Sequence, residues 1–227
     1  MLFRSITTNT VGNPTGSKFF DAAITVFWIV GICNSINFFD NLDGGASGTI
    51  AISSIALFIL AFNGSQFLIA ALSVVIAGST FGFLLWNKSP ARIYMGDAGA
   101  LFLGILIASL TIRLKPDFDS PAASLLTPIL LLAVPILDTS VAVTSRIARG
   151  LSPLQGGKDH LSHRLMRIGL TKPQAAFTLW GLTGVFSLVA LVMDQFTKTN
   201  QNFLLICFGI LWCLLFVFFF RTSHEDK

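Results

Sequence analysis

The chain has 227 residues, of which 53% are hydrophobic and only 11% are charged, and its mean hydropathy is +0.76. Soluble domains carry roughly 25% charged residues, so this composition excludes an ordinary soluble protein and indicates a polytopic membrane protein. The net charge of +4 gives no reason to expect nucleic-acid binding, and the expected environment is the membrane bilayer.

Long runs without a charged residue predict the membrane-spanning helices. A helix needs about 20 apolar residues to cross the hydrocarbon core. The uncharged run 44–87 must therefore hold two helices, which separate at residues 63–66. The predicted fold is an all-α polytopic transmembrane bundle with about seven spans, near residues 22–39, 46–62, 67–86, 98–114, 123–145, 174–194 and 202–220.

Residues 1–21 are predicted to form an exposed N-terminal segment, 22–220 one integral membrane domain and 221–227 a cytoplasmic tail. Seven spans place successive loops on alternating sides. The side with loops 40–45, 87–97 and 146–173 holds ten Lys and Arg residues, against five on the other side. The positive-inside rule makes it cytoplasmic, so the predicted location is the inner (plasma) membrane with a cytoplasmic active face.

The first span ends in a cluster of amides and carboxylates. Asn34, Asn37, Asp40 and Asp43 recur every three residues, and residues at this spacing share a face when they are helical. Ionisable groups at the edge of a membrane segment are costly, so the cluster is a candidate functional site. The alternative is a polar helix end that runs into a solvated loop.

The second loop brings Asp97 to the start of a new span. A carboxylate there could hold Mg²⁺, which proteins bind through one or two carboxylates together with substrate phosphates. The alternative is that Asp97 is the N-cap of the following helix. Tyr94 could stack on a planar ligand, or it could be an interfacial anchor.

Pro128 and Pro135 predict that the fifth span is broken or kinked. Asp138 follows them at or near membrane depth. It belongs either to the site or to an ion pair with Arg146 or Arg149 at the same helix end.

The third loop, 146–173, is basic and holds His160 and His163 beside Asp159. Such a loop suits an anionic, phosphate-bearing substrate; the alternative is a segment that contacts anionic lipid. Because two spans separate each of the three loops from the next, all three face the same side. Five of the eleven acidic residues lie at these motifs, which predicts one shared polar site.

Three motifs, in this order along the chain, resemble those of the polyprenyl-phosphate N-acetylhexosamine-1-phosphate transferases, glycosyltransferase family 4. This family includes the phospho-N-acetylmuramoyl-pentapeptide transferases and the UDP-GlcNAc:undecaprenyl-phosphate transferases. The resemblance runs from about residue 22 to residue 172. The motifs are Asn34-x-x-Asn37-x-x-Asp40-x-x-Asp43-Gly44, Met95-Gly96-Asp97-x-Gly99 and Asp159-His160-x-x-His163-Arg164-Leu165.

The resemblance implies that a sugar-1-phosphate moves from a UDP-sugar to a membrane polyprenyl phosphate, with release of UMP and use of Mg²⁺, at the start of cell-envelope glycan synthesis. It implies that Asp97 is the Mg²⁺ ligand. The other implied site residues have three roles: Asn34, Asn37, Asp40 and Asp43 would line the nucleotide and active-site cleft, Asn87 and Tyr94 would lie against the uracil, and His160, His163 and Arg164 would contact the sugar and phosphates. Of these, Asp40, Asp43, His160 and His163 are the catalytic candidates beside Asp97.

The chain departs from the family pattern at three positions and in its upstream part. Asn41 stands where the family usually has Gly, Gly45 stands where it often has Leu, and Ser162 replaces a middle histidine of many members. Family members also carry further upstream spans with a loop of two adjacent aspartates, and no Asp-Asp pair occurs here. The chain therefore resembles the C-terminal portion of a transferase. The alternatives are a truncated protein, a half that pairs with another polypeptide or as a homodimer, and an inactive relative.

Two other classes of function compete with the transferase. One is a non-catalytic membrane subunit that binds a nucleotide-sugar. The other is a transporter, because polar residues and broken helices within the membrane also mark transport sites. Transporters place such groups near the midplane, often in paired halves, whereas here the polar groups gather in loops on one side and no internal repeat is visible.

Overall fold

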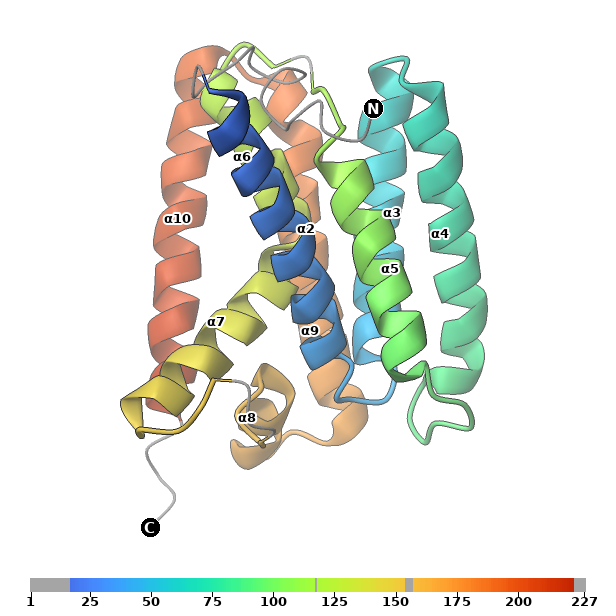
Figure 1. Cartoon of the computed structure of the whole chain (residues 1–227), viewed down its shortest axis with the longest axis vertical. Helices are drawn as coiled ribbons and strands as arrows, with labels where there is room; N and C mark the ends of the chain where they lie inside the picture. The colour runs from blue at the N-terminus through green and yellow to red at the C-terminus, as the bar shows by residue number, and fades with distance from the viewer. Residues whose placement is uncertain (1–16, 117, 154–156, 223–227) are drawn as a thin grey trace.

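The computed structural model describes residues 17–116, 118–153 and 157–222, and every regular element in this part of the chain is helical (Figure 1). The predicted all-α bundle is therefore confirmed. The helices are α2 (Lys18–Phe39), α3 (Gly45–Asn63), α4 (Phe67–Asn87), α5 (Gly96–Thr111), α6 (Pro121–Leu131), α7 (Ala133–Ala148), α8 (Leu161–Arg167), α9 (Lys172–Val192) and α10 (Lys198–Arg221), with a 3₁₀ turn at Met193–Gln195.

Five of these helices, α2, α3, α4, α9 and α10, are long and apolar enough to cross a membrane. Helices α6 and α7 together form a sixth candidate that is bent by 70°. Helix α5 has only 16 residues, so the predicted total of seven is reached only if this shorter apolar helix is counted. Helix α2 begins at Lys18, four residues before the predicted start of the first span. Most of the predicted N-terminal segment (1–16) and tail (223–227) lies outside the described residues.

The bend between α6 and α7 lies between the two prolines, as the sequence predicts. Pro135 is in the first turn of α7 and has no N–H to donate to the carbonyl of Leu131, four residues earlier. The hydroxyl of Ser53 on α3 donates to that carbonyl instead, at 2.7 Å. The indole of Trp212 on α10 donates to the carbonyl of Ala133 at 3.4 Å. The Ser53 hydroxyl thus replaces the backbone donor that the Leu131 carbonyl loses at the bend.

A close approach of α2 and α5 sets the position of the first two motifs. A Cβ atom on Gly104 would lie 2.7 Å from the Cα atom of Cys33, so only glycine fits at this crossing. The Cys33 thiol contacts the carbonyl of Leu101 at 3.3 Å, and the indole of Trp28 donates to the carbonyl of Ala108 at 3.2 Å. These contacts fix the start of α5 beside the end of α2.

The motif loops gather at one end of the bundle. Figure 1 shows that the C-terminal ends of α2, α4 and α7 lie there, together with the N-terminal ends of α3, α5 and α9 and with α8. The α3–α4, α5–α6 and α9–α10 connections lie at the opposite end. The predicted alternation of the loops is therefore confirmed, whereas the assignment of one end to the cytoplasm stays a prediction.

Candidate active site

An acidic cluster lies where the end of α2 meets the start of α5. The Asn37 amide donates to Asp97 Oδ1 at 3.2 Å, although the two residues are 60 positions apart. Asp97 is exposed, and Asp40, the C-cap of α2, is half-buried. Burial and the negative charge of Asp97 raise the pKa of Asp40 to about 6. A divalent cation would relieve the repulsion between these two carboxylates.

The structure tests whether Asp97 is the N-cap of α5. The N-cap of α5 is Met95, and Asp97 lies inside the first turn with no side-chain capping bond. The N-cap alternative is therefore wrong. A carboxylate in the first turn is still favoured by the helix dipole. Asn34, further back on α2, is exposed, and its amide donates to the carbonyl of Val30 in its own helix at 2.7 Å.

Asn87 at the end of α4 holds the second loop to the first motif. Its side-chain oxygen accepts from the backbone N–H of Gly44 at 3.1 Å and from the Ser47 hydroxyl at 2.9 Å, and its amide donates to the carbonyl of Ile93 at 2.9 Å. Asn87 is only 3% exposed, so its side chain organises the loop from inside the protein. Its predicted contact with a uracil base stays a prediction.

Two other side chains of the predicted site lie on this loop or against it. The Asp43 carboxylate accepts from the backbone N–H of Ala91 at 3.3 Å, which adds a further link between the first two loops. Tyr94 is 74% exposed, so its ring is open to solvent or to a ligand. Stacking of Tyr94 on a planar ligand stays a prediction.

Gly44 of the first motif and Gly48 of α3 lie against Trp180 of α9, a residue that the sequence analysis did not identify. Gly44 adopts a left-handed conformation, with φ of 75°, which L side chains rarely adopt. The indole N–H of Trp180 donates to the Gly44 carbonyl at 3.0 Å. A Cβ atom on Gly48 would lie only 2.2 Å from the Trp180 ring. The turn after Asp43 is thus held from the side by α9.

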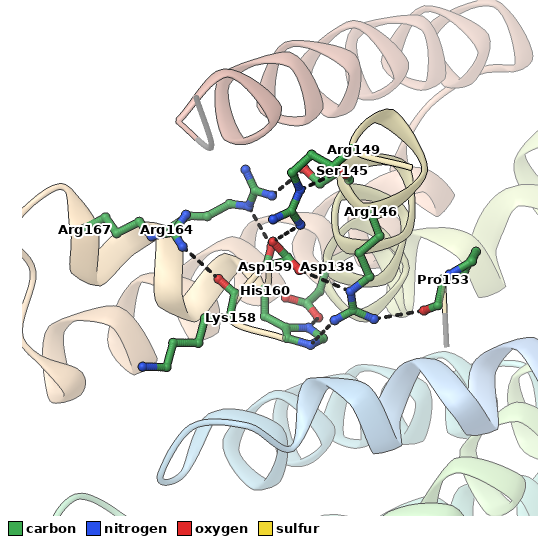
Figure 2. Close-up of polar contacts among 10 residues, drawn as sticks. All are labelled: Asp138, Ser145, Arg146, Arg149, Pro153, Lys158, Asp159, His160, Arg164 and Arg167. Atoms are coloured by element: carbon green, nitrogen blue, oxygen red, sulfur yellow. Dashed lines mark hydrogen bonds and ion pairs between the residues drawn. The ribbon is translucent and has the colours of Figure 1, made fainter. Parts of the chain in front are cut away.

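In the third loop, each ring nitrogen of His160 contacts a side chain of α7 (Figure 2). Its Nδ1 atom lies 2.7 Å from Asp138 Oδ2, and its Nε2 atom lies 3.3 Å from an Arg146 guanidinium nitrogen. The other Asp138 oxygen accepts from the backbone N–H of Leu161 at 2.7 Å. Asp138 is fully buried. Both ring nitrogens of His160 therefore have protein partners.

The two arginines of α7 pair with Asp159. Arg146 contacts one carboxylate oxygen at 3.2 Å and Arg149 contacts the other at 2.5 Å (Figure 2). The suggested ion pair of Asp138 with either arginine is therefore wrong, because Asp138 binds His160 and both arginines bind Asp159. Burial alone would raise the pKa of Asp159, but the hydrogen bonds and charges of Arg146 and Arg149 hold it below its usual value.

Arg164 ties α8 to its neighbours from a fully buried position. Its guanidinium donates to the carbonyl of Asp159 at 2.7 Å, to the carbonyl of Phe219 on α10 at 2.6 Å and to the Ser145 hydroxyl on α7 at 2.6 Å. Burial lowers its pKa to about 10, so the side chain stays charged at neutral pH. Its predicted contact with sugar and phosphates stays a prediction.

Ser162 and His163 bring the third loop to the first. The Ser162 hydroxyl donates to the side-chain oxygen of Asn41, 121 positions away, and the Asn41 amide donates to the carbonyl of Phe38 at 2.7 Å. His163 Nδ1 lies 3.3 Å from the Ser162 oxygen. Burial and the nearby His160 lower the pKa of half-buried His163. Two positions where the chain departs from the family pattern, Asn41 and Ser162, are thus in direct contact.

The donor set fits a cation that is shared with a ligand. Within the ranges that the structure describes, no three His, Cys, Asp or Glu side chains surround a common point. The Asp97 carboxylate nevertheless lies close enough to Asp40 for its negative charge to raise the pKa of Asp40, and Mg²⁺ is commonly held by one or two carboxylates plus substrate phosphates. These two residues would hold the ion.

The arrangement defines a class: an integral membrane protein of bundled helices, with carboxylates and a basic histidine-bearing loop brought together at one membrane face. The chain belongs to glycosyl transferase family 4, whose family model matches residues 1–115. The family that the motifs indicate is therefore confirmed.

Several curated relatives are similar to the chain. A probable undecaprenyl-phosphate N-acetylglucosaminyl 1-phosphate transferase of Bacillus subtilis (strain 168) is 37% identical over 86% of the chain and 51% of the relative. A decaprenyl-phosphate N-acetylglucosaminephosphotransferase of Mycolicibacterium smegmatis is 33% identical over 72% of the chain and 45% of the relative. A phospho-N-acetylmuramoyl-pentapeptide-transferase of Streptococcus agalactiae is 39% identical over 43% of the chain and 29% of the relative. The chain spans about half the length of the first two relatives.

Proposed function

We propose that the chain takes part in the transfer of an N-acetylhexosamine-1-phosphate from a UDP-sugar to a membrane polyprenyl phosphate, with release of UMP. The observation that carries the proposal is the convergence of the three motif loops. Asn37 of the first motif contacts Asp97 of the second, and Asn41 of the first contacts Ser162 of the third. Residues far apart in sequence thus form one polar site on a protein whose relatives are named for this transfer.

The charges of the site suit the substrates. Phosphoryl transfer depends mostly on positioning and on neutralising the phosphate charge. Mg²⁺ bound by Asp97 and Asp40 would supply part of that neutralisation. Lys158 and Arg167 lie close enough to His163 for their charges to lower its pKa, so α8 and the loop before it present positive potential to a diphosphate. Because the acceptor is a lipid, a site at the membrane face lets its phosphate reach the nucleotide-sugar.

The residues of the site fall into two groups, those that position the loops and those that would contact the ligand. Asn87, Arg164 and His160 lie inside hydrogen-bond networks, so they position the loops. Asp97 and Tyr94 are exposed and His163 is half-buried at the same end of the bundle, which supports them as the side chains that would contact the ligand. Because the chain spans about half of its longer relatives, we expect it alone to bind a UDP-sugar weakly and to turn over little.

The experiment that tests the proposal measures both binding and transfer. Purified protein in lipid nanodiscs is titrated with UDP-N-acetylglucosamine in Mg²⁺, and transfer of radiolabelled sugar phosphate to undecaprenyl phosphate is followed in parallel. We expect weak Mg²⁺-dependent binding that Asp97→Asn abolishes. The matched control is Asp119→Asn in the α5–α6 connection at the opposite end of the bundle, which should leave binding unchanged.

The outcomes separate the competing hypotheses. Binding that is lost in Asp97→Asn, with slow transfer, supports the transferase. Mg²⁺-dependent binding without any transfer, even with a supplied N-terminal half of a relative, supports a non-catalytic binding subunit. If neither a UDP-sugar nor UDP binds, the proposal is wrong.

A further inference from the structure

A directed chain of hydrogen bonds runs from the end of α2 to the ring of His163. It starts at the Phe38 carbonyl, which accepts from the Asn41 amide at 2.7 Å. It continues from the Asn41 side-chain oxygen to the Ser162 hydroxyl, and it ends with Ser162 Oγ 3.3 Å from His163 Nδ1. Each link constrains the direction of the next.

The direction follows from the chemistry of each group. A backbone carbonyl can only accept, so the Asn41 amide nitrogen must face Phe38 and its oxygen must face Ser162. A serine hydroxyl has a single hydrogen, and Ser162 gives this hydrogen to Asn41. The Ser162 oxygen can then only accept from His163. The hydrogen on the neutral His163 ring must therefore be on Nδ1.

We infer that Ser162, oriented by Asn41, fixes His163 as the Nδ1–H tautomer, so that Nε2 presents a lone pair to the site. A ring nitrogen in this state accepts hydrogen bonds and does not donate them. It therefore suits a ligand hydroxyl or amide N–H and disfavours a phosphate oxygen. If the proposed function holds, His163 contacts a donor group of the sugar, such as a ring hydroxyl or the acetamido N–H.

His160 provides an internal comparison. Its Nδ1 faces the Asp138 carboxylate and its Nε2 faces Arg146, so neither nitrogen is left for a ligand. His163 has a single hydrogen-bond contact among the described side chains, at Nδ1. Because the pKa of His163 is lowered, its ring is neutral at neutral pH and carries a single N–H. The two histidines of the motif therefore have different roles: His160 positions the loop, and His163 contacts the ligand.

The tautomer is measured directly by ¹⁵N NMR of the full chain labelled at its three histidines, in nanodiscs at neutral pH. Loss of a signal pair in His163→Gln assigns the ring. The unmodified protein should show a protonated Nδ1 and an unprotonated Nε2. Ser162→Ala removes the acceptor for Nδ1–H, and Asn41→Ala frees the Ser162 hydrogen to donate to Nδ1. Both variants should therefore move the ring toward the Nε2–H form.

Two variants serve as controls. Ser162→Thr keeps the hydroxyl and should keep the Nδ1–H form. Ser73→Ala, whose hydroxyl donates to the Ile69 carbonyl within α4, should leave the His163 signals unchanged. A His163 ring that is Nε2–H in the unmodified protein overturns the inference. So does a ring that stays Nδ1–H in both Ser162→Ala and Asn41→Ala.

A binding measurement tests the sugar contact separately. Loss of one hydrogen bond should weaken binding of the UDP-sugar by roughly fivefold in Ser162→Ala while UDP binding changes little. An equal loss for UDP and the UDP-sugar overturns the sugar contact. If neither ligand binds the unmodified protein, the proposed function fails while the tautomer result stands, because the NMR measurement needs no ligand.

Discussion

At the scale of single residues, Asp40 and Asp97 show how the fold creates an energetic cost that a ligand can relieve. The pKa of Asp40 is raised to about 6. Between the ordinary carboxyl value of about 4 and this value, the folded protein holds a proton at Asp40 that the unfolded chain releases. The contribution of Asp40 to stability therefore falls as pH rises through that window and stays unfavourable above it. A cation bound at neutral pH would offset this cost.

Replacing Asp97 should change the titration of Asp40. In Asp97→Asn the neighbouring negative charge is gone, so the ionised form of Asp40 is favoured and its pKa falls below about 6. It should stay above the ordinary value because burial, the larger cause, remains. Carbon-13 NMR of labelled aspartate carboxyls measures the titration, with Asp119→Asn as the control. An Asp40 pKa that is unchanged in Asp97→Asn would contradict the electrostatic account.

The residues of the acidic cluster could be predicted from the sequence, whereas the roles of the amide and arginine residues could not. The three-residue spacing from Asn34 to Asp43 predicts one helix face, and ionisable groups at a membrane boundary indicate a site. The shared face is wrong for Asp43, because α2 ends at Phe39 and Asp43 lies in the turn beyond it. From the sequence alone, an Asn87 that binds a ligand cannot be distinguished from an Asn87 that forms hydrogen bonds within the protein. Its partners Gly44 and Ser47 lie about 40 positions earlier, so only the packing of α3 against α4 reveals its internal role.

At the scale of helices, the bend between α6 and α7 depends on a partner outside the bent segment. Ser53 of α3 is buried and donates to the carbonyl of Leu131, which Pro135 leaves without a backbone donor. Ser53→Ala should lower the free energy of unfolding by about 1–3 kcal/mol, because a buried carbonyl loses its hydrogen bond. Denaturant unfolding in detergent micelles, followed by tryptophan fluorescence, measures the change.

A matched serine separates this effect from the loss of any buried hydroxyl. Ser73 is also buried, but it donates to a carbonyl of its own helix that is not freed by a proline. Ser73→Ala should therefore cost much less than Ser53→Ala, and equal costs would show that the bend does not need Ser53. The two prolines predict the bend from sequence alone. The identity of Ser53 as the donor cannot be predicted, because 78 positions separate it from Leu131.

At the scale of the whole molecule, the polar site and the apolar surface are separated along the bundle. Only 17% of the most apolar stretch of α10 is buried, and 33% of the corresponding stretches of α2 and α4, so these helices present large apolar faces. Such faces suit lipid or further membrane helices. The polar contacts between motifs all lie at one end. The end that carries the site is therefore also the end whose orientation in the membrane determines which pool of nucleotide-sugar it can reach.

The excess of basic residues predicts that this end faces the cytoplasm. In a background with Cys33, Cys207 and Cys213 replaced by alanine, Tyr94→Cys reports on the loop of the site, and Lys198→Cys reports on the opposite end at the start of α10. Both positions are exposed, so a membrane-impermeant maleimide reaches either one from the side it faces. In intact cells we expect labelling of Lys198→Cys alone, with Tyr94→Cys labelled only after the membrane is permeabilised. Labelling of Tyr94→Cys in intact cells would place the site on the outer face, where a cytoplasmic UDP-sugar could not serve as its donor.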